Sequence, residues 1–126
     1  MYQTITTNLM VENVKETIHF YQTVLGFTVV DQVPKTDEEL VFAIIKKDEI
    51  MLMLQEKQSL MEEYPTLVAD TIKPSFTLFI TVKDVKQLYE QLKDTVTIAK
   101  DLHQTFYGTN EFAIFDNNQY ILTISQ

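Results

Sequence analysis

Apolar and polar positions along the chain follow two periods, one typical of strands and one typical of helices. Residues 4–11 are predicted to form a strand, and Asn13 is then expected to cap a helix that begins at Val14. Glu16 completes a capping box, and Gly26 supplies the left-handed residue that ends many helices. The apolar positions of this helix recur every three or four residues and share one face: Val14, Ile18, Tyr21 and Leu25.

Three strands are predicted after this helix, at residues 27–33, 40–46 and 49–55, and the last two form a hairpin. A polar connector follows, with a short helix expected at residues 59–63. The same order of elements then returns. It consists of a strand at 75–82, a helix from the cap Asp84 through Leu92, and strands at 96–102, 111–115 and 120–125.

The sequence itself also repeats between the two halves. Residues 9–15 (LMVENVK) return about 70 positions later as residues 80–86 (ITVKDVK), and Phe-Ala-Ile at 42–44 returns at 112–114. Neither half is long enough to enclose a core alone. We therefore expect a single α+β domain of two βαβββ modules, residues 1–56 and 75–126, joined by a connector at 57–74. The modules should form a mixed, curved sheet around a cavity where the halves meet.

Composition and charge exclude some classes of binding partner and indicate the cellular compartment. The 126 residues are 45% hydrophobic, which fits one compact domain. A formal charge of −8 argues against a nucleic-acid partner and favours cationic small molecules. The absence of Cys excludes disulfides and thiolate metal sites. The first residues do not form a signal peptide and no apolar run approaches the roughly 20 residues that span a bilayer, so we expect a cytoplasmic protein without a membrane partner.

Two groups of motifs resemble a known superfamily. The first group is NLMVENV at 8–14, HFY at 19–21 and VLGF at 24–27, and the second is YG at 107–108, EFA at 111–113 and DNNQY at 116–120. They are similar to the opening and closing signatures of the vicinal-oxygen-chelate superfamily, which includes glyoxalases, bleomycin resistance proteins and dioxygenases. The resemblance implies the glyoxalase/bleomycin-resistance-like fold and a homodimer. In enzymes of the superfamily, His, Gln or Glu side chains hold a divalent metal that acts as a Lewis acid.

The resemblance places the four metal-ligand slots on Thr6, Met53, Thr77 and Thr123. Hydroxyl and thioether groups are poor ligands for hard or borderline divalent ions. A shift of any of these strands by one residue brings in only apolar side chains or another Thr. We therefore expect neither a metal nor another cofactor.

Strand alternation predicts an inward face of hydroxyl, amide, thioether and aromatic side chains, a lining that suits small organic molecules. His103, in the loop before Tyr107, could reach the mouth of the cavity. No nucleophile–base motif or phosphate-binding loop is present, so no catalytic residue is expected. The predicted ligand-binding residues are Thr6, Asn8, Phe42, Met53, Thr77, Phe79, His103, Tyr107, Phe112 and Thr123.

The preferred hypothesis is a metal-free protein that binds or sequesters a small cationic or aromatic molecule without changing it chemically. One alternative is a metal-dependent lyase, isomerase or dioxygenase of the same superfamily, with ligands from residues such as His103, Glu111 and Asp116. A second alternative is a non-catalytic module that binds another protein. Metal affinity favours the first alternative, and a sealed cavity without ligand uptake favours the second.

Overall fold

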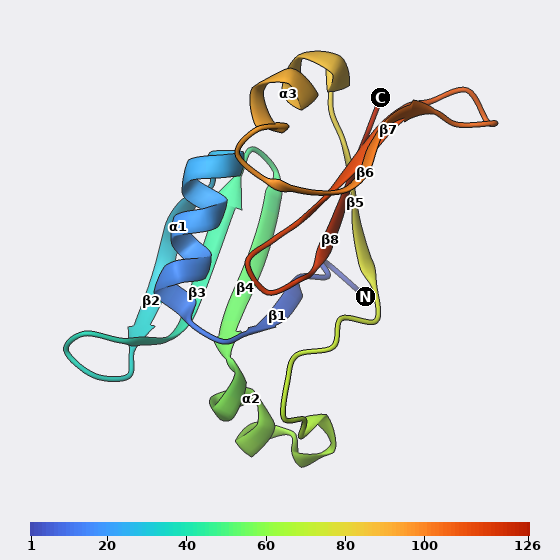
Figure 1. Cartoon of the computed structure of the whole chain (residues 1–126). Helices are drawn as coiled ribbons and strands as arrows, with labels where there is room; N and C mark the ends of the chain where they lie inside the picture. Colours follow the sequence, from blue (N-terminus) through green and yellow to red (C-terminus); the bar gives the residue numbers. More distant parts are fainter. The chain divides into compact units, whose positions relative to one another are not determined.

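Two four-stranded sheets, each with its own helix, make up the structure (Figure 1). The computed structural model describes residues 1–126, which divide into two compact units, Met1–Ile72 and Lys73–Gln126. Each unit contains one βαβββ module, so the predicted α+β fold class is confirmed. The connector lies almost entirely in the first unit, where it forms a short helix, α2 (Lys57–Glu63), and a single 3₁₀ turn, Pro65–Leu67.

The first unit places its strands in the order β1-β4-β3-β2. Its elements are β1 (Thr7–Val11), α1 (Val14–Leu25), β2 (Thr28–Pro34), β3 (Leu40–Lys47) and β4 (Ile50–Glu56). β1 runs parallel to β4, whereas β3 pairs antiparallel with both β2 and β4. The sheet is therefore mixed, as expected when a hairpin follows a helical crossover.

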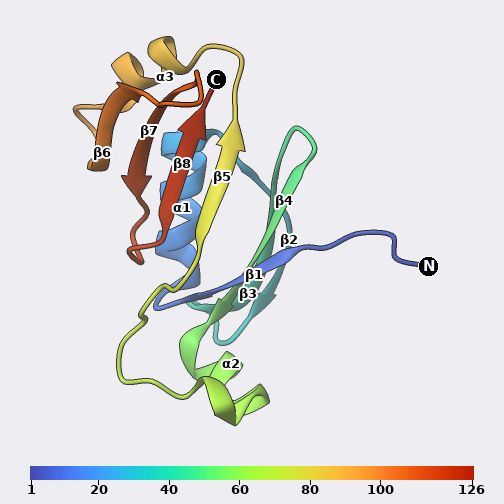
Figure 2. The ribbon, with the colours of Figure 1, turned by 90° about the vertical axis from the view of Figure 1, so that its right-hand side faces the viewer.

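The second unit repeats this order as β5-β8-β7-β6, and Figure 2 shows the four strands side by side. Its elements are β5 (Thr77–Thr81), α3 (Val85–Leu92), β6 (Thr97–Gln104), β7 (Asn110–Phe115) and β8 (Ile121–Ser125). Again the strand before the helix pairs in parallel with the last strand, β8. The remaining pairs are antiparallel.

The predicted helix ends are confirmed. The Asn13 side chain accepts a hydrogen bond from the Glu16 backbone N–H at 2.9 Å, and Asp84 accepts one from Gln87 at 3.0 Å. Each cap satisfies one of the backbone N–H groups that the first helical turn leaves unpaired. Gly26 ends α1 with a φ of 74°, a left-handed conformation that glycine adopts without strain.

Each sheet buries one face against its own helix. In the first unit, α1 packs on β3 and β4, and the fully buried side chains alternate along the strands, as with Leu9, Ile45 and Leu54. In the second unit α3 packs on β7, where Tyr89 and Phe112 meet edge to face with ring centroids 5.2 Å apart. The alternate side chains of each sheet point away from these helices. We call that side the open face of each sheet.

Four predicted boundaries are wrong by two or three residues, and one of them is the start of β5, which lies at Thr77 rather than Ser75. β1 begins at Thr7 rather than Thr4, because its parallel ladder with β4 starts at the pair Thr7 and Leu52. The residues before Thr7 leave the sheet, and Ile5 is 99% exposed. α2 begins at Lys57 directly after β4, and β6 continues to Gln104 because it stays paired with β7.

The repeated Phe-Ala-Ile triplets face opposite sides of their sheets. Phe42 pairs with Gln55 on the open face of β4, whereas Phe112 pairs with Ile124 on the helix side of β8. The cause is turn length. Two residues, 48–49, separate Lys47 from Ile50, whereas three, 117–119, separate the hydrogen-bonded Asp116 and Tyr120. One extra residue shifts the register by one and exchanges the faces.

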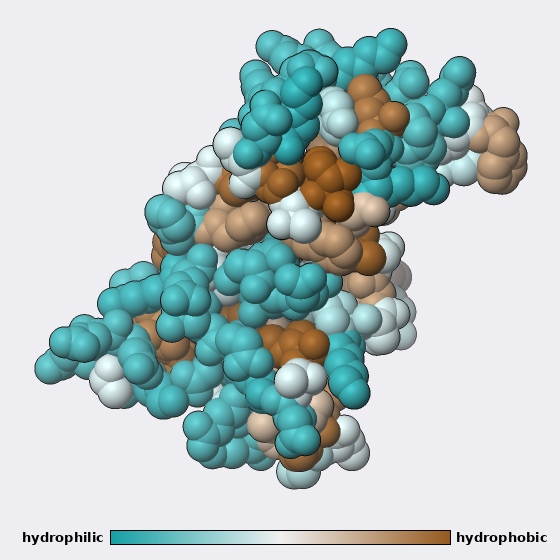
Figure 3. All heavy atoms as spheres, in the orientation of Figure 1, coloured by the Kyte–Doolittle hydropathy of each residue, from teal (hydrophilic) through white to brown (hydrophobic).

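Most of the surface visible in Figure 3 is hydrophilic, with hydrophobic residues gathered in smaller patches. None of the helices has both the length and the apolar character needed to cross a membrane.

Removal of either helix cap should destabilise the protein. Asn13→Ala and Asp84→Ala should each lower the free energy of unfolding by about 1 kcal/mol, because a helix N–H loses its acceptor. Urea unfolding followed by circular dichroism measures this change. The exchanges Asn13→Asp and Asp84→Asn keep an acceptor oxygen and serve as controls. Equal stability of the alanine and control variants would contradict the role assigned to the caps.

Candidate functional site

The open face of the first sheet carries apolar and amide side chains. Phe42 and Ile44 of β3 are register partners of Gln55 and Met53 of β4, and β1 adds Asn8 opposite Met53. These side chains are partly buried, unlike the fully buried positions on the other side of the same strands. Three predicted binding residues, Asn8, Phe42 and Met53, therefore share this face. Thr6, the fourth in this unit, lies just before β1.

A chain of polar side chains crosses this face and continues onto α2. Asn8 Nδ2 donates to Gln55 Oε1 at 2.9 Å, and Gln55 Nε2 donates to Ser59 Oγ at 3.0 Å and to Glu63 Oε1 at 3.1 Å. The remaining acceptor, Asn8 Oδ1, is buried and has no hydrogen-bond partner. Buried polar atoms are almost always paired, so an orphaned one is unusual.

The open face of the second sheet is richer in hydroxyl groups. Thr77 and Phe79 of β5 are register partners of Ile121 and Thr123 of β8, and Thr123 also pairs with Ala113 of β7. Phe79 is 58% exposed, although it is a large aromatic residue within a strand. Predicted binding residues Thr77, Phe79 and Thr123 therefore share this face.

The most buried charge on this face is Glu111 of β7, which is 5% exposed. Its carboxylate accepts hydrogen bonds from Ser125 Oγ at 2.8 Å, from Thr109 Oγ1 at 3.0 Å, and from Tyr107 Oη at 3.1 and 3.2 Å. Three neutral hydroxyls thus take the place of water around a buried charge. Such an arrangement keeps a carboxylate ionised without an ion pair.

Two opposing effects act on the pKa of the Glu111 carboxyl. Burial raises the pKa, since it disfavours the charged form. The three hydroxyl donors, with Ser125 contributing most, and the nearby His103 together lower the pKa by more. The pKa of Glu111 therefore lies below its ordinary value.

His103 and Asp116, named with Glu111 as alternative metal ligands, do not lie together. His103 lies in β6 rather than in the predicted loop and pairs with the start of β7, whereas Asp116 follows the end of β7. His103 is the register partner of Glu111, and its Nδ1 lies 2.8 Å from the Asp101 backbone oxygen. Asp116 follows β7 and is only 3% exposed. Its Oδ1 accepts hydrogen bonds from the backbone N–H groups of Asn118 and Tyr120, at 2.8 and 3.0 Å. Asp116 thus shapes the turn before β8.

Tyr107 and Phe112, two of the predicted binding residues, make side-chain contacts within the second unit. Tyr107 is 59% exposed, but its hydroxyl holds Glu111. Phe112 is fully buried and packs on Tyr89 of α3, so its ring faces the helix rather than the open face. The sequence interpretation did not include Glu111 among the binding residues. Its burial depends on donors from the β6–β7 turn and from β8, which the local sequence does not reveal.

The four positions that the resemblance assigns to metal ligands carry side chains that suit a divalent ion poorly. Met53, Thr77 and Thr123 lie on the open faces and Thr6 lies before β1, and they offer a thioether and three hydroxyls. Within neither unit do three or more His, Asp or Glu side chains gather in a way that could hold a metal.

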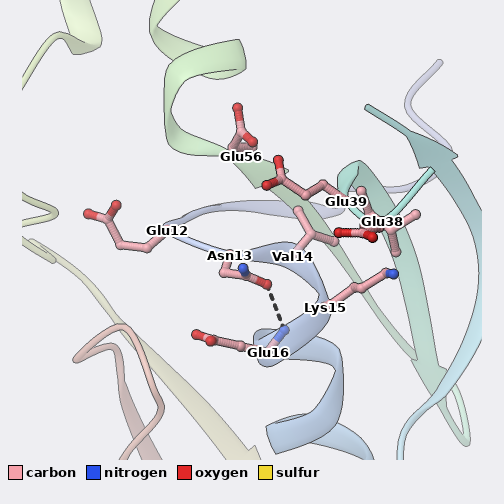
Figure 4. A pocket seen from close by; sticks show the side chains of 9 residues that line it. Glu12, Asn13, Val14, Lys15, Glu16, Glu38, Glu39 and Glu56 are labelled. Atoms are coloured by element: carbon pink, nitrogen blue, oxygen red, sulfur yellow. Dashed lines mark hydrogen bonds between the residues drawn. The ribbon is translucent and has the colours of Figure 1, made fainter. Parts of the chain in front are cut away.

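A separate acidic pocket of about 250 Å³ lies at the start of α1 (Figure 4). Its walls come from the start of α1, the loop before β3 and the end of β4: Glu12, Asn13, Val14, Lys15, Glu16, Glu38, Glu39, Leu40 and Glu56. Glu56 forms an ion pair with Lys35 at 3.0 Å, and Glu12 forms one with Lys57 at 3.3 Å. None of the ten predicted binding residues lines this pocket.

Ser125→Ala should raise the pKa of Glu111, because the strongest of the lowering hydrogen bonds is lost. A lowered folded-state pKa adds stability above the unfolded-state pKa, and this stability is lost as the pH falls through the folded-state pKa. The variant should therefore lose more stability relative to wild type at neutral pH than in acid. A ¹³C NMR titration of the Glu111 carboxyl and urea unfolding at both pH values measure the two effects.

Thr123→Ala is the matched control, since Thr123 lies on the same strand and its hydroxyl is not among the groups that shift the pKa of Glu111. If Ser125→Ala and Thr123→Ala gave the same titration midpoint as wild type, the hydroxyl cluster would not control the charge of Glu111.

Comparison with known proteins supports the fold described above. The family model of the Glyoxalase/Bleomycin resistance protein/Dioxygenase superfamily matches residues 4–124. No curated protein matches the chain. A glyoxalase-related enzyme from Fulvimarina pelagi is 16% identical, with 99% of this chain and 88% of that chain covered and a TM-score of 0.79. Lactoylglutathione lyase from Agrobacterium tumefaciens is 15% identical, with 99% of this chain and 94% of that chain covered and a TM-score of 0.74.

A protein of unknown function from Agrobacterium tumefaciens str. C58 is 14% identical, with 99% and 94% of the two chains covered and a TM-score of 0.79. At such identities the likeness concerns the fold alone. The family model, in contrast, spans the strands and helices of both units. The chain therefore belongs to the Glyoxalase/Bleomycin resistance protein/Dioxygenase superfamily.

Proposed function

We propose that this protein binds a small organic molecule, aromatic or cationic, without a metal and without changing the molecule chemically. The observation that carries the proposal is the character of the open faces. Three of the four positions that the resemblance assigns to metal ligands lie on these faces, and they carry a thioether or a hydroxyl where the metal enzymes of the superfamily need imidazole or carboxylate. The faces also offer aromatic and amide groups, which suit a small organic molecule.

The aromatic part of the proposal rests on Phe79. A Phe side chain that is 58% exposed in the middle of a strand leaves apolar surface in water, which is unfavourable unless a partner covers it. The neighbouring Thr77 and Thr123 can supply hydrogen bonds at the edge of a planar ligand. On the first sheet, Met53 adds a flexible side chain that adapts to different shapes.

The cationic part rests on charge. The chain carries a net charge of −8, and the hydrogen-bond donors to the buried carboxylate of Glu111 are neutral hydroxyls. An excess of negative charge on the protein favours a ligand with an ammonium or amidinium group.

A metal-dependent enzyme is the second candidate, because His103 lies opposite the ionised Glu111 in the β6–β7 ladder. These two residues would be two ligands of a site that needs at least one more. A non-catalytic protein-interaction module has no comparable observation in its favour. A homodimer stays a prediction from the resemblance, to be measured by size-exclusion chromatography with light scattering.

Metal titration separates the two candidates. We expect chelator-treated protein to bind none of Ni²⁺, Mn²⁺, Fe²⁺ and Zn²⁺ at micromolar strength in a calorimeter, because the slot residues lack suitable donors. Tight stoichiometric binding by the wild type, lost in His103→Ala, would instead support the enzyme.

Ligand binding is tested with a panel of small aromatic compounds, in pairs with and without a positive charge, such as benzamidine with benzamide and tryptamine with indole. We expect calorimetry to detect binding, with the charged member of each pair preferred. Phe79→Ser should weaken binding roughly tenfold, because stacking and apolar contact are lost.

Phe106→Ser is the matched control for this substitution. Phe106 is also an exposed Phe of the second unit, but it lies in the turn between β6 and β7, outside the strands. An equal loss in both variants, or no binding by any compound of the panel, would contradict the proposal.

A further inference from the structure

The hydrogen-bonded chain of Asn8, Gln55 and Glu63 on the first sheet has a fixed direction from donor to acceptor. Glu63 lies at one end of it, and a carboxylate accepts hydrogen bonds but donates none. Gln55 must therefore turn its Nε2 toward Glu63, at 3.1 Å, which leaves its Oε1 facing Asn8. Asn8 must in turn present Nδ2 to that oxygen, at 2.9 Å. The acceptor-only character of Glu63 thus sets the orientation of both amides, even though the two ends of an amide are similar in shape.

The consequence is that Asn8 Oδ1 is the atom left over. It is buried, and no donor of the chain reaches it. The side chain of its register partner Met53 and that of Ile44, which pairs with Met53 on the same face, have no N–H or O–H group to offer. An unpaired buried acceptor is costly, and its pairing with a donor from outside the chain removes that cost.

We propose that Asn8 Oδ1 accepts a hydrogen bond from the bound molecule, so that the first sheet selects compounds that carry an N–H or O–H donor beside an apolar ring. This inference rests on the proposed binding function and adds to it the polarity of the ligand. Glu63 of α2, which bonds to Gln55 and acts on Asn8 only through it, is then a positioning residue for specificity. A water molecule is the other possible donor, and the experiment below separates the two.

Indole and benzofuran provide a matched pair of probes, because they have nearly the same shape and differ in having an N–H donor or an oxygen acceptor. In an NMR titration, wild-type protein should bind indole roughly fivefold to tenfold more tightly than benzofuran, as expected for one hydrogen bond. The Asn8 side-chain amide signals should shift on addition of indole. If only water occupies the acceptor, the two compounds bind equally and the inference is overturned.

The substitution Glu63→Gln tests the direction of the polar chain. A Gln at this position can donate as well as accept, so Gln55 and Asn8 are free to turn around and offer Nδ2 to the ligand. We expect the preference for indole over benzofuran to fall toward onefold. Glu62→Gln is the matched control, since it removes the same charge from the same helix while Glu62 faces Gln58 instead, at 3.4 Å. The control should keep the wild-type preference.

A separate readout needs no ligand. Scalar coupling across the hydrogen bond should connect Asn8 Nδ2 with the Gln55 side-chain carbonyl carbon in wild type and in Glu62→Gln, and should weaken in Glu63→Gln. A coupling in the opposite sense overturns the inference. Equal binding of indole and benzofuran also overturns it while leaving the proposed function intact, whereas the absence of binding by the whole aromatic panel overturns both.

Discussion

One helix per four-stranded sheet is the constraint on which the rest of the structure depends. A strand points successive side chains to opposite faces, so the helix can bury only half of them. In the first unit that half includes Leu9, Ile45 and Leu54, which are fully buried. The side chains of the other half point away from the helix and cannot be buried by it. The open faces therefore follow from the topology, and the chemistry of the protein is decided by which residues occupy the alternate positions.

The two open faces handle their polar groups differently. On the second sheet, Glu111 is surrounded by the hydroxyls of Ser125, Thr109 and Tyr107, which satisfy the carboxylate from within the unit. On the first sheet, the amides of Gln55 and Asn8 form a directed chain that ends in an unsatisfied acceptor. A satisfied cluster holds a turn and a charge in place, whereas an unsatisfied one stores free energy that a bound donor can recover.

The sequence predicted the fold class and the helix caps because both depend on local patterns, namely period, Asn13, Asp84 and Gly26. It did not predict the environment of Glu111, which depends on residues from β7, β8 and the turn between β6 and β7. The repeated Phe-Ala-Ile triplets suggested equivalent positions for Phe42 and Phe112, and the structure differs for a similar reason. The match in sequence is clear, but the register is set by a turn that is one residue longer in the second unit, so Phe42 and Phe112 face opposite sides.

Ligand binding and Lewis-acid catalysis make different demands on a sheet of this kind. Lewis-acid chemistry needs several ligands of the right type at fixed distances, and a Thr or Met at even one slot weakens the metal site. Binding needs only apolar surface and a few well-placed polar atoms, and on the second sheet Phe79 and Thr123 can supply both from separate strands. A scaffold of this kind can therefore lack metal ligands and still offer a binding surface, since the open faces remain wherever the helix–sheet packing is retained.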